Sequence, residues 1–544
     1  MPKADCYPTT IVPGLSRFYL DFCAAQPAAL GFYAAPPQPA WPARPALPAH
    51  WTEFVRLLAA QNPAVQNPSS TAAQALESLR AGAGAVVTGQ QVALFGGPLF
   101  TPLKAATALA HARQATAAGH PHAAIFWLAS EDHDFAEINH VVFPARRELR
   151  KLSYTSADAD AARPVGGLVL GDAINPLLDQ AWELLGASEA MDALSAAYQP
   201  GQTLAQAFAS FYSAVFAAQG LLVLDASTRD FHRLGAPVLR AGIERADELH
   251  AALLDRNRAL EAAGYHAQVA VTPQSSLLFL VDTQSGAQSG ARIALKRTAP
   301  SAAEPDGLWH AGRQAYSTAD LIGILDAEPE RISPAALLRP VFQDFLISNS
   351  LVVGGPAEIA YFAQSAVLYE RILGRQTAAA PRFSATLIEP AIAELLHRHE
   401  LPLERVFTET QDSLTQLLAA RALPIEGKRK LAAAGNALDA ELTPLLDWMQ
   451  ALDVGLGRSA GVSASKMRYQ MNRLRRLAAN FQVQKEDSLG RHAATICQAL
   501  YPNGTLQERL HGAAYYFARH GFDLAETLTA YAPTSCPGHT ALWL

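Results

Sequence analysis

The run SEDHDFAEINHV, residues 130–141, places a histidine between two carboxylates, an arrangement that can move protons. His133 is flanked by Asp132 and Asp134. An imidazole titrates near neutral pH, so one that a neighbouring carboxylate orients can act as a general base for an amine. We interpret His133 as the catalytic base, with Asp132 and Asp134 as its catalytic partners.

The same run admits two other interpretations. Hard oxygen ligands suit Mg²⁺, so Asp132, Asp134, Glu131 and His140 can instead form a divalent metal site. Alternatively, the run is a charged loop in which Asp132 or Asp134 caps the next helix. We expect structural roles for Glu131 and His140, and Asn139 is a candidate binding residue.

A glycine turn in TGQQVALFGGPLFTPLK, residues 88–104, is a second candidate site. An apolar strand leads into it and an alanine-rich helix follows, so free N–H groups and the positive end of the helix dipole converge there. Such a turn can bind an anion or a nucleotide, although neither the dinucleotide-binding nor the P-loop fingerprint is present. The alternative is a plain helix cap, with Thr101 as N-cap, Pro102 as first helical residue and an exposed lysine one turn later. The candidate binding residues are Gln90, Gln91, Gly96, Gly97, Pro98 and Lys104.

The segment VVGGPAEIAYFAQ, residues 352–364, repeats the order of strand, glycine turn and helix. We expect this turn, with Gly354, Gly355, Glu358 and Gln364, to form the second wall of one cleft. Glu358 can bind a substrate ammonium group there. A glutamate that only lies at a helix N-terminus would complement the dipole and do nothing more.

Two further segments contribute candidate binding residues. In SPAALLRPVFQDFL, Arg339 can present a guanidinium fork to a carboxylate, with Asp344 downstream, although a structural Arg–Asp pair is the alternative. In LYPNGTLQERL, Gln507 and Arg509 can reach a nucleotide.

The elements that must position these residues are predicted to form an α/β sheet. Apolar runs at 85–88, 123–128 and 221–227 predict strands, and a helix at 102–118 joins the first two. The crossover should be right-handed and the sheet parallel. The polar residues after the second strand would then lie where parallel sheets bind ligands. Asp225 ends the third strand in the position of an acidic group that binds a ribose or a metal, although we favour the alternative that it caps the next helix.

The rest of the chain predicts insertions and a helical arm. Residues 145–202 are expected to form an insertion with short strands at 149–155 and 166–170 followed by helix, and residues 268–332 a small antiparallel β insertion. Residues 386–485 predict a coiled-coil arm that can dimerise, broken near Pro424 and around 455–461. Residues 1–144 are predicted to hold a proline-rich strap at 36–48 and the first half of the core, which continues at 203–267 and 333–385. Residues 486–544 predict a helical segment that packs back on the core.

Composition limits the possible functions. A chain of 544 residues that is 50% apolar can bury a large core in several modules. With 43 basic against 49 acidic residues, a net charge of −6 gives no broad attraction for nucleic acid or an anionic membrane. Prolines interrupt the N-terminus and no apolar run reaches membrane-spanning length, so we expect a soluble, cytoplasmic protein.

The four cysteines suggest neither a disulfide framework nor a zinc site. They are scattered, without a CxxC pair or the spacing of metal ligands. We therefore expect Cys6, Cys23, Cys497 and Cys536 to be reduced and to do no chemistry.

Five segments together, at 88–104, 126–141, 333–346, 352–364 and 500–510, resemble the BshC family of bacillithiol biosynthesis in the same order along nearly the whole chain. The resemblance implies a Rossmann-like core related to nucleotidylyl-transferase and class I synthetase folds. It also implies two connecting-peptide insertions and a coiled-coil arm that forms a homodimer.

The activity that the resemblance implies is a ligase reaction that adds L-cysteine to glucosaminyl-malate. Forming an amide near neutral pH requires an activated acyl group, most simply from ATP, with Mg²⁺ as a possible companion. Two alternatives stay open: a transferase that takes cysteine already activated, and a nucleotide-binding dimeric scaffold without catalysis.

Overall fold

The computed structural model describes residues 2–33, 46–145, 148–156, 162–283, 290–298, 307–485, 488–532, 536 and 538–544. The predicted proline strap at 36–48 therefore lies mostly outside the described residues. The chain divides into two compact units, the larger built from most of residues 1–386 with 508–541, the smaller mainly from 387–507. Within the described chain, no helix combines the length and the hydropathy that crossing a membrane requires.

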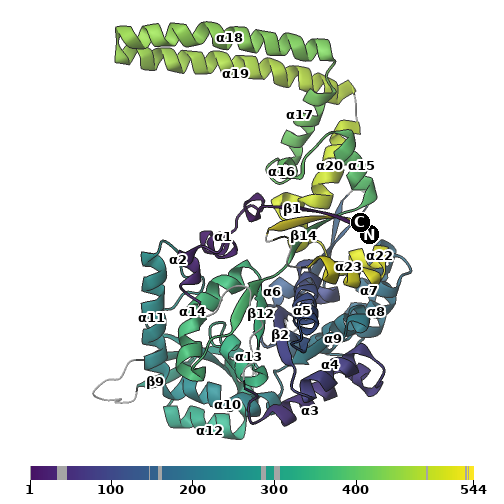
Figure 1. Cartoon of the computed structure of the whole chain (residues 1–544), viewed down its shortest axis with the longest axis vertical. Helices are drawn as coiled ribbons and strands as arrows, with labels where there is room; N and C mark the ends of the chain where they lie inside the picture. Colours follow the sequence, from purple (N-terminus) through teal and green to yellow (C-terminus); the bar gives the residue numbers. More distant parts are fainter. Residues whose placement is uncertain are drawn as a thin grey trace. The chain divides into compact units, whose positions relative to one another are not determined.

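A five-stranded parallel sheet, in the order β13-β12-β2-β3-β6, forms the centre of the larger unit (Figure 1). The predicted strand–helix–strand unit is confirmed, since β2 pairs with β3 in parallel with Val87 opposite Ile125. The strands are β2 (Gly84–Gln91), β3 (His122–Ala129), β6 (Leu222–Asp225), β12 (Leu351–Gly354) and β13 (Ala378–Pro381).

Both faces of this sheet are covered by helices, so its strands are largely apolar, except that β2 ends in Gln90 and Gln91. Alternate side chains of β3 point to opposite faces: Ile125 and Trp127 join a core with α3, α4 and α10, whereas Phe126 contacts the rings of α9. Helix α5 packs against β2 and β3. The helices are α3 (Trp51–Gln61), α4 (Thr71–Arg80), α5 (Phe100–Ala117), α9 (Leu204–Val215), α10 (Arg229–Glu244), α13 (Arg339–Ile347) and α14 (Pro356–Leu373).

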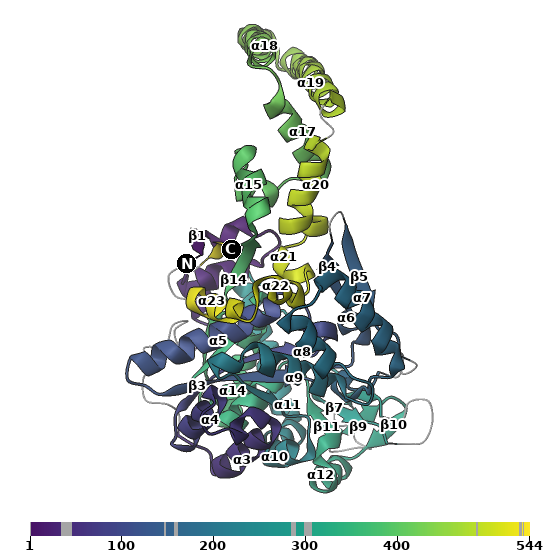
Figure 2. The ribbon, with the colours of Figure 1, turned by 90° about the vertical axis from the view of Figure 1, so that its right-hand side faces the viewer.

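One smaller sheet lies in the segment predicted as the second insertion, and another joins the end of the predicted core segment 1–144 to the start of the first insertion. The β-rich segment forms an antiparallel sheet in the order β10-β9-β8-β7-β11, as the alternating pattern predicted (Figure 2). Near residue 150 the chain forms a hairpin of β4 (His140–Pro144) and β5 (Leu149–Ser153). The predicted strand at 166–170 is instead a 3-10 turn, Val165–Gly167, followed by a single bridge from Val169 to Thr203.

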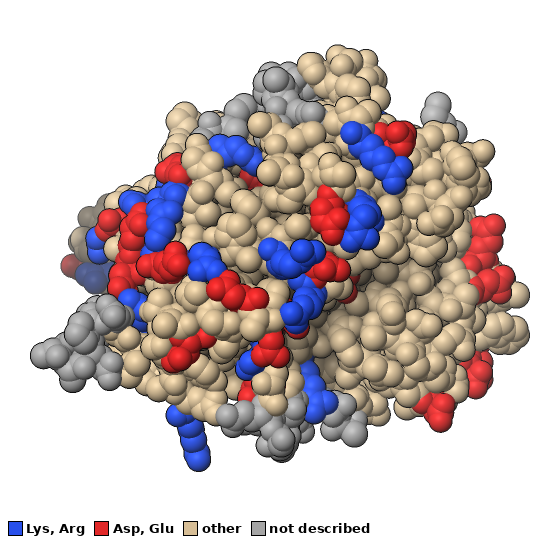
Figure 3. Space-filling view, turned by 90° about the horizontal axis from the view of Figure 1, so that it is seen from below, with Lys and Arg blue, Asp and Glu red and all other residues tan. Residues whose placement is uncertain are grey.

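The remaining described helices and strands of the larger unit are α1 (Arg17–Cys23), α2 (Pro27–Leu30), α6 (Phe135–Ile138), α7 (Asn175–Leu185), α8 (Glu189–Ala197), α11 (Ala246–Ala262), α12 (Thr318–Ala327), α22 (Ala513–His520), α23 (Asp523–Tyr531), β7 (Ser275–Val281), β8 (Arg292–Thr298), β9 (Leu308–Ala311), β10 (Gln314–Tyr316) and β11 (Ile332–Pro334). On the face seen in Figure 3, acidic and basic side chains are interspersed over much of the surface.

The smaller unit is helical, and its two longest helices, α18 (Ile425–Leu452) and α19 (Val454–Lys485), run side by side (Figures 1 and 2). The predicted break near Pro424 is present, because that residue precedes α18. The break expected around 455–461 is wrong: the chain turns at Asp453, and the glycines lie within α19. The other helices are α15 (Pro390–Arg398), α16 (Leu403–Val406), α17 (Gln411–Ala422) and α20 (Ser488–Leu500), and α21 (Gln507–Leu510) follows at the boundary of the units.

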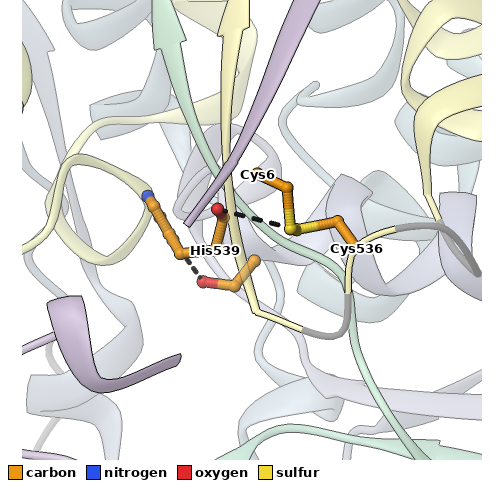
Figure 4. The surroundings of a disulfide bond; sticks show 4 residues. Cys6, Cys536 and His539 are labelled. Atoms are coloured by element: carbon orange, nitrogen blue, oxygen red, sulfur yellow. Dashed lines mark hydrogen bonds between the residues drawn. A yellow bond between two sulfur atoms is a disulfide. The ribbon is translucent and has the colours of Figure 1, made fainter. Parts of the chain in front are cut away.

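The expectation of four reduced cysteines is wrong. Cys6 and Cys536 form a disulfide across a sequence separation of 530 residues (Figure 4), whereas Cys23 and Cys497 are free thiols. Cys6 lies in β1 (Lys3–Tyr7), which belongs to a three-stranded sheet in the order β1-β15-β14. The other strands of this sheet are β14 (Ser384–Ile388) and β15 (His539–Trp543). The spacing of the cysteines in the sequence does not indicate this pairing, because only folding brings the two ends of the chain together.

Candidate functional site

A cavity of about 380 Å³ opens at the carboxyl ends of the central strands, the edge where parallel sheets bind ligands. Its walls come from the ends of β2, β3 and β12, the first turns of α13 and α14, and α5. The lining residues with polar or aromatic side chains are Gln90, Gln91, Phe100, Lys104, Trp127, Asp132, Glu137, Arg339, Gln343, Glu358, Tyr361, Phe362, Arg382 and Arg509.

A buried lysine joins three walls of the cavity. The Lys104 ammonium on α5 donates to the Gly89 carbonyl at 2.7 Å and to Gln90 Oε1 at 3.0 Å. It forms a 2.5 Å ion pair with Glu358, which also accepts from the Gly355 N–H at 2.8 Å. Burial lowers the pKa of Lys104, and Glu358 opposes that shift. The two predicted turn regions therefore meet through this ion pair.

Three arginines add positive charge to the same cavity. Arg339 begins α13, and its Nε is buried without a hydrogen-bond partner among the described residues. Arg382 follows β13 and is held by a bidentate pair with Glu508, at 2.5 and 3.1 Å. Burial works against the charged guanidinium, but Glu508 outweighs it and raises the pKa of Arg382. Arg509 on α21 is exposed. Such a set of cations suits carboxylate or phosphate groups.

Besides Glu358, two further carboxylates line the cavity alongside these cations. Asp132 follows β3, and Glu137 lies on the short helix α6. Partial burial raises the pKa of Glu137, and the negative charges of Asp134 and Asp132 raise it further. A carboxylate with a raised pKa is better matched to accepting a proton near neutral pH than an ordinary one.

The predicted catalytic histidine lies outside this lining. His133 Nδ1 is 3.9 Å from Asp132 Oδ1, too long for a hydrogen bond, and its ring lies beside Phe279 with centroids 5.8 Å apart. Asp134 caps α6 by accepting from the Glu137 N–H at 3.2 Å, which is the capping role that the sequence left open.

The other polar residues of this run have structural contacts. Asn139 ends α6 and contacts His140 Nδ1 at 3.2 Å. Glu131 forms a buried 3.0 Å pair with His232, as a structural role requires. Among the described residues, no three His, Cys, Asp or Glu side chains are placed to hold a metal ion, so the alternative metal site is not assembled.

The first glycine turn requires a correction, because its backbone groups are already used. Gly96 N–H donates to the Tyr198 hydroxyl at 2.9 Å and Gly97 N–H to the Leu94 carbonyl at 3.0 Å. Gly96 has φ +80°, and a Cβ there would lie 2.5 Å from the Phe211 ring. Gly96, Gly97 and Pro98 do not line the cavity, and α5 begins at Phe100 rather than after a Thr101 cap. The glycines permit close packing instead of anion binding.

Three other predicted binding residues are buried structural groups outside the lining. Asp344 pairs with Arg375 at 2.7 Å instead of with Arg339. Gln364 bonds to the backbone of Val269 through both ends of its amide. Gln507 does the same with Leu387. Of the second turn, Gly355 and Glu358 line the cavity and Gly354 precedes them in β12.

Sequence reasoning missed Arg382, Glu508 and Glu137. A single arginine after a short strand carries no local pattern, and its partner Glu508 lies 126 residues away. One signal was available for Glu508, because it stands between Gln507 and Arg509 in the segment already singled out.

The sheet, the cavity at its carboxyl edge and the helical second unit define a Rossmann-like protein with a cleft lined by several cationic side chains and with a coiled-coil domain. The chain belongs to the BshC family of bacillithiol biosynthesis: the N-terminal Rossmann-like domain model of that family matches residues 6–382, and its C-terminal coiled-coil domain model matches residues 385–542. The predicted family and fold class are thus confirmed.

Individual relatives agree with the family match. A protein of Koribacter versatilis named "Putative cysteine ligase BshC" is 39% identical over 99% of both chains. One of the same name from Solibacter usitatus is 34% identical over 88% of this chain and 87% of its own. A solved structure titled "Crystal structure of putative arginyl t-RNA synthetase from Campylobacter jejuni" matches over 88% of this chain and 98% of its own. Its TM-score of 0.20 and identity of 11% are too low to bear on the fold.

Proposed function

We propose that this chain is a ligase of bacillithiol biosynthesis that joins the carboxyl group of L-cysteine to the amine of glucosaminyl-malate. The observation that carries the proposal is the cavity at the carboxyl edge of the sheet, where Lys104, Arg339 and Arg382 meet Asp132 and Glu137. The names of the relatives supply cysteine as one substrate, and the family resemblance implies glucosaminyl-malate as the other.

The charges of the cavity match the charges of these substrates. Glucosaminyl-malate carries carboxylates and an amine, and cysteine contributes a further carboxylate. Arg339, with its unpartnered Nε, is the arginine best placed to receive a carboxylate oxygen, because binding would satisfy a buried donor.

ATP is the activator that we propose for the cysteine carboxyl, since amide formation needs a better leaving group than hydroxide. The positively charged lining suits a polyphosphate, and Mg²⁺ would accompany the nucleotide because it commonly binds phosphates with one or two carboxylates. Asp132 and Glu137 are the carboxylates of this lining that can contribute to such binding.

Glu137 replaces His133 as our proposed proton acceptor. The amine nitrogen attacks the activated acyl carbon, the leaving group departs with its electron pair, and the ammonium proton passes to the Glu137 carboxylate. Cations of the lining stabilise the negative charge that develops on the acyl oxygen and the leaving group. Glu137 lines the cavity and His133 does not.

We also propose that the coiled-coil unit forms a homodimer. Large apolar side chains are exposed along both of its long helices, an unusual surface for a monomer. They include Trp448, Leu452, Leu456, Tyr469, Leu477 and Phe481.

The direct test incubates the purified chain with cysteine, glucosaminyl-malate, ATP and Mg²⁺ and measures bacillithiol by mass. Product together with AMP or ADP supports the ligase. Product without nucleotide turnover, or only with a preformed cysteinyl donor, supports a transferase. Nucleotide binding by folded protein without product under any condition supports a scaffold and contradicts the ligase.

A further inference from the structure

The disulfide joins the two ends of the chain on an accessible surface. Cys6 is exposed in β1, and Cys536 is half-buried just before β15. Because thiol–disulfide exchange requires a thiolate to reach a sulfur atom, the exposed position of Cys6 is where a small thiol would approach the disulfide.

Contacts lead from this disulfide to His539 in β15. The Cys536 sulfur lies 3.8 Å from the His539 carbonyl oxygen, which Figure 4 shows facing the disulfide. The buried His539 ring contacts the Ser384 and Thr386 hydroxyls of β14, both at 2.8 Å. The covalent link between the termini is thereby coupled to the edge of β14.

The contacts continue from β14 into the cavity. The Ser384 hydroxyl is 3.3 Å from both oxygens of Glu508, and the Ala385 N–H donates to Glu508 at 3.0 Å. The same carboxylate makes the bidentate pair with Arg382, which lines the cavity and lies over the Phe100 ring. Glu508 is thus shared between the strand that His539 holds and the guanidinium of the site.

We propose that the Cys6–Cys536 disulfide is a redox switch that sets how well Arg382 is positioned in the cavity, and that small thiols reduce it. A thiolate RS⁻ attacks one sulfur, forming a mixed disulfide and releasing the other cysteine as a thiolate; a second thiol then releases the first cysteine and leaves as RSSR. In this exchange the protein gains two electrons and two protons, and the two small thiols are oxidised to one disulfide.

The direction of the switch follows from the contacts. In the oxidised chain the disulfide holds β1 and β15, so that His539, Ser384 and Glu508 keep the Arg382 fork fixed. Reduction removes the covalent restraint and weakens binding of an anionic substrate. This inference rests on the proposed function in one respect, because the product of that reaction, bacillithiol, would itself be a small thiol. Oxidising conditions would then favour bacillithiol synthesis, and accumulated bacillithiol would reduce the disulfide and slow its own synthesis.

The first experiment is independent of activity. One sample of the full chain is oxidised and another is reduced with an excess of cysteine, and both are treated with an alkylating reagent. The reagent should label two more cysteines, Cys6 and Cys536, in the reduced sample than in the oxidised one. Amide hydrogen exchange of the peptides covering 384–388 and 507–510 should become about tenfold faster in the reduced protein. Unchanged exchange there, with both cysteines alkylated, overturns the switch.

The second experiment measures initial rates of turnover in both states, and alkylation at the end of each assay verifies that the cysteine substrate has not reduced the oxidised chain. Reduction should raise KM for glucosaminyl-malate about three- to tenfold while kcat changes less than about twofold. Equal KM values in the two states overturn the coupling to the cavity. Absence of product in both states contradicts the proposed function alone, because hydrogen exchange still decides the switch.

Variants locate the effect. Cys6→Ser should show the reduced-state exchange and KM under oxidising and reducing conditions alike, whereas Cys497→Ser, which removes a free thiol, should respond as the unmodified chain does. Glu508→Gln should give a high KM that no longer depends on the redox state. A Cys6→Ser protein that still responds to oxidation contradicts the proposal, and if it does not fold, the alkylated unmodified chain provides the same comparison.

Discussion

Lys104 illustrates how the place of a residue in the fold can be predicted while its contacts are not. The sequence suggested either a phosphate-binding lysine or an exposed lysine one turn into a helix. The structure places it in the cavity but buried, with its ammonium shared among Gly89, Gln90 and Glu358. Local spacing fixed its helix, whereas its partner Glu358 depends on strands that pair only in the folded sheet.

Removing one member of this buried pair should destabilise the protein more than removing both. We expect Lys104→Met to lower the free energy of unfolding by about 3 kcal/mol, because it leaves the Glu358 carboxylate uncompensated. The double variant Lys104→Met, Glu358→Gln should recover part of that loss. Urea unfolding of the four proteins in the cycle measures the coupling, and strictly additive losses would mean that the pair contributes nothing.

The proposed base gives a prediction with a pH signature. Glu137→Gln should reduce kcat about a hundredfold with a smaller effect on KM, since a general base typically contributes at least that factor. Because the pKa of Glu137 is raised and a base works only when deprotonated, activity should fall as pH falls through a value above that of an ordinary glutamate.

Two matched variants separate Glu137 from its neighbours. Asp134→Asn, which retains an oxygen to cap α6, should change kcat less than about threefold. His133→Ala tests the original interpretation. A large loss of kcat in His133→Ala, with Glu137→Gln unaffected, would restore the histidine as base.

At the scale of elements, the sequence predicted the core well because its signals were local. Apolar runs at 85–88 and 123–128 became β2 and β3, with the crossover helix between them. The glycines at 455–461 misled because each costs a helix only about 1 kcal/mol, which the packing of α18 against α19 can offset.

The candidate site was predictable only in part, because local sequence signals place only some of its residues. Gln90, Arg339 and Glu358 lie directly after strands or at helix starts, so topology placed them at the ligand-binding edge. Gly96 looked like an anion site but packs under Phe211, and Arg382 depends on a partner 126 residues away. Whether a turn's N–H groups stay free is a tertiary property that spacing does not encode.

Strand β15 carries a titration that should appear in stability. Burial lowers the pKa of His539 from its ordinary value of 6.5 to about 4. Between these values the imidazole binds a proton in the unfolded chain but not in the folded one. The free energy of unfolding should therefore fall as pH falls from about 6.5 to 4, and this group should lower it no further below pH 4.

His539→Gln tests this titration. The variant should show a shallower decline of stability across that pH window than the unmodified chain, measured by denaturant unfolding at each pH. The buried His111, whose pKa burial also lowers to about 4, is present in both proteins and cancels in the comparison. Identical slopes would show that His539 does not contribute to acid sensitivity.

At the scale of the whole molecule, the exposed apolar side chains of α18 and α19 predict the oligomeric state. Trp448 and Phe481 are 57% and 66% exposed, and the burial of each such side chain is worth about 1.5–3 kcal/mol. We therefore expect Trp448→Asp with Phe481→Asp to weaken a homodimer at least about a hundredfold, observed by sedimentation as a shift from dimer to monomer at micromolar concentration. Lys466→Asp, an exposed polar position of the same helix α19, is the matched control and should leave the dimer intact. A monomeric unmodified chain would contradict dimerisation through these helices, and a dimer that survives the double substitution would place the interface elsewhere.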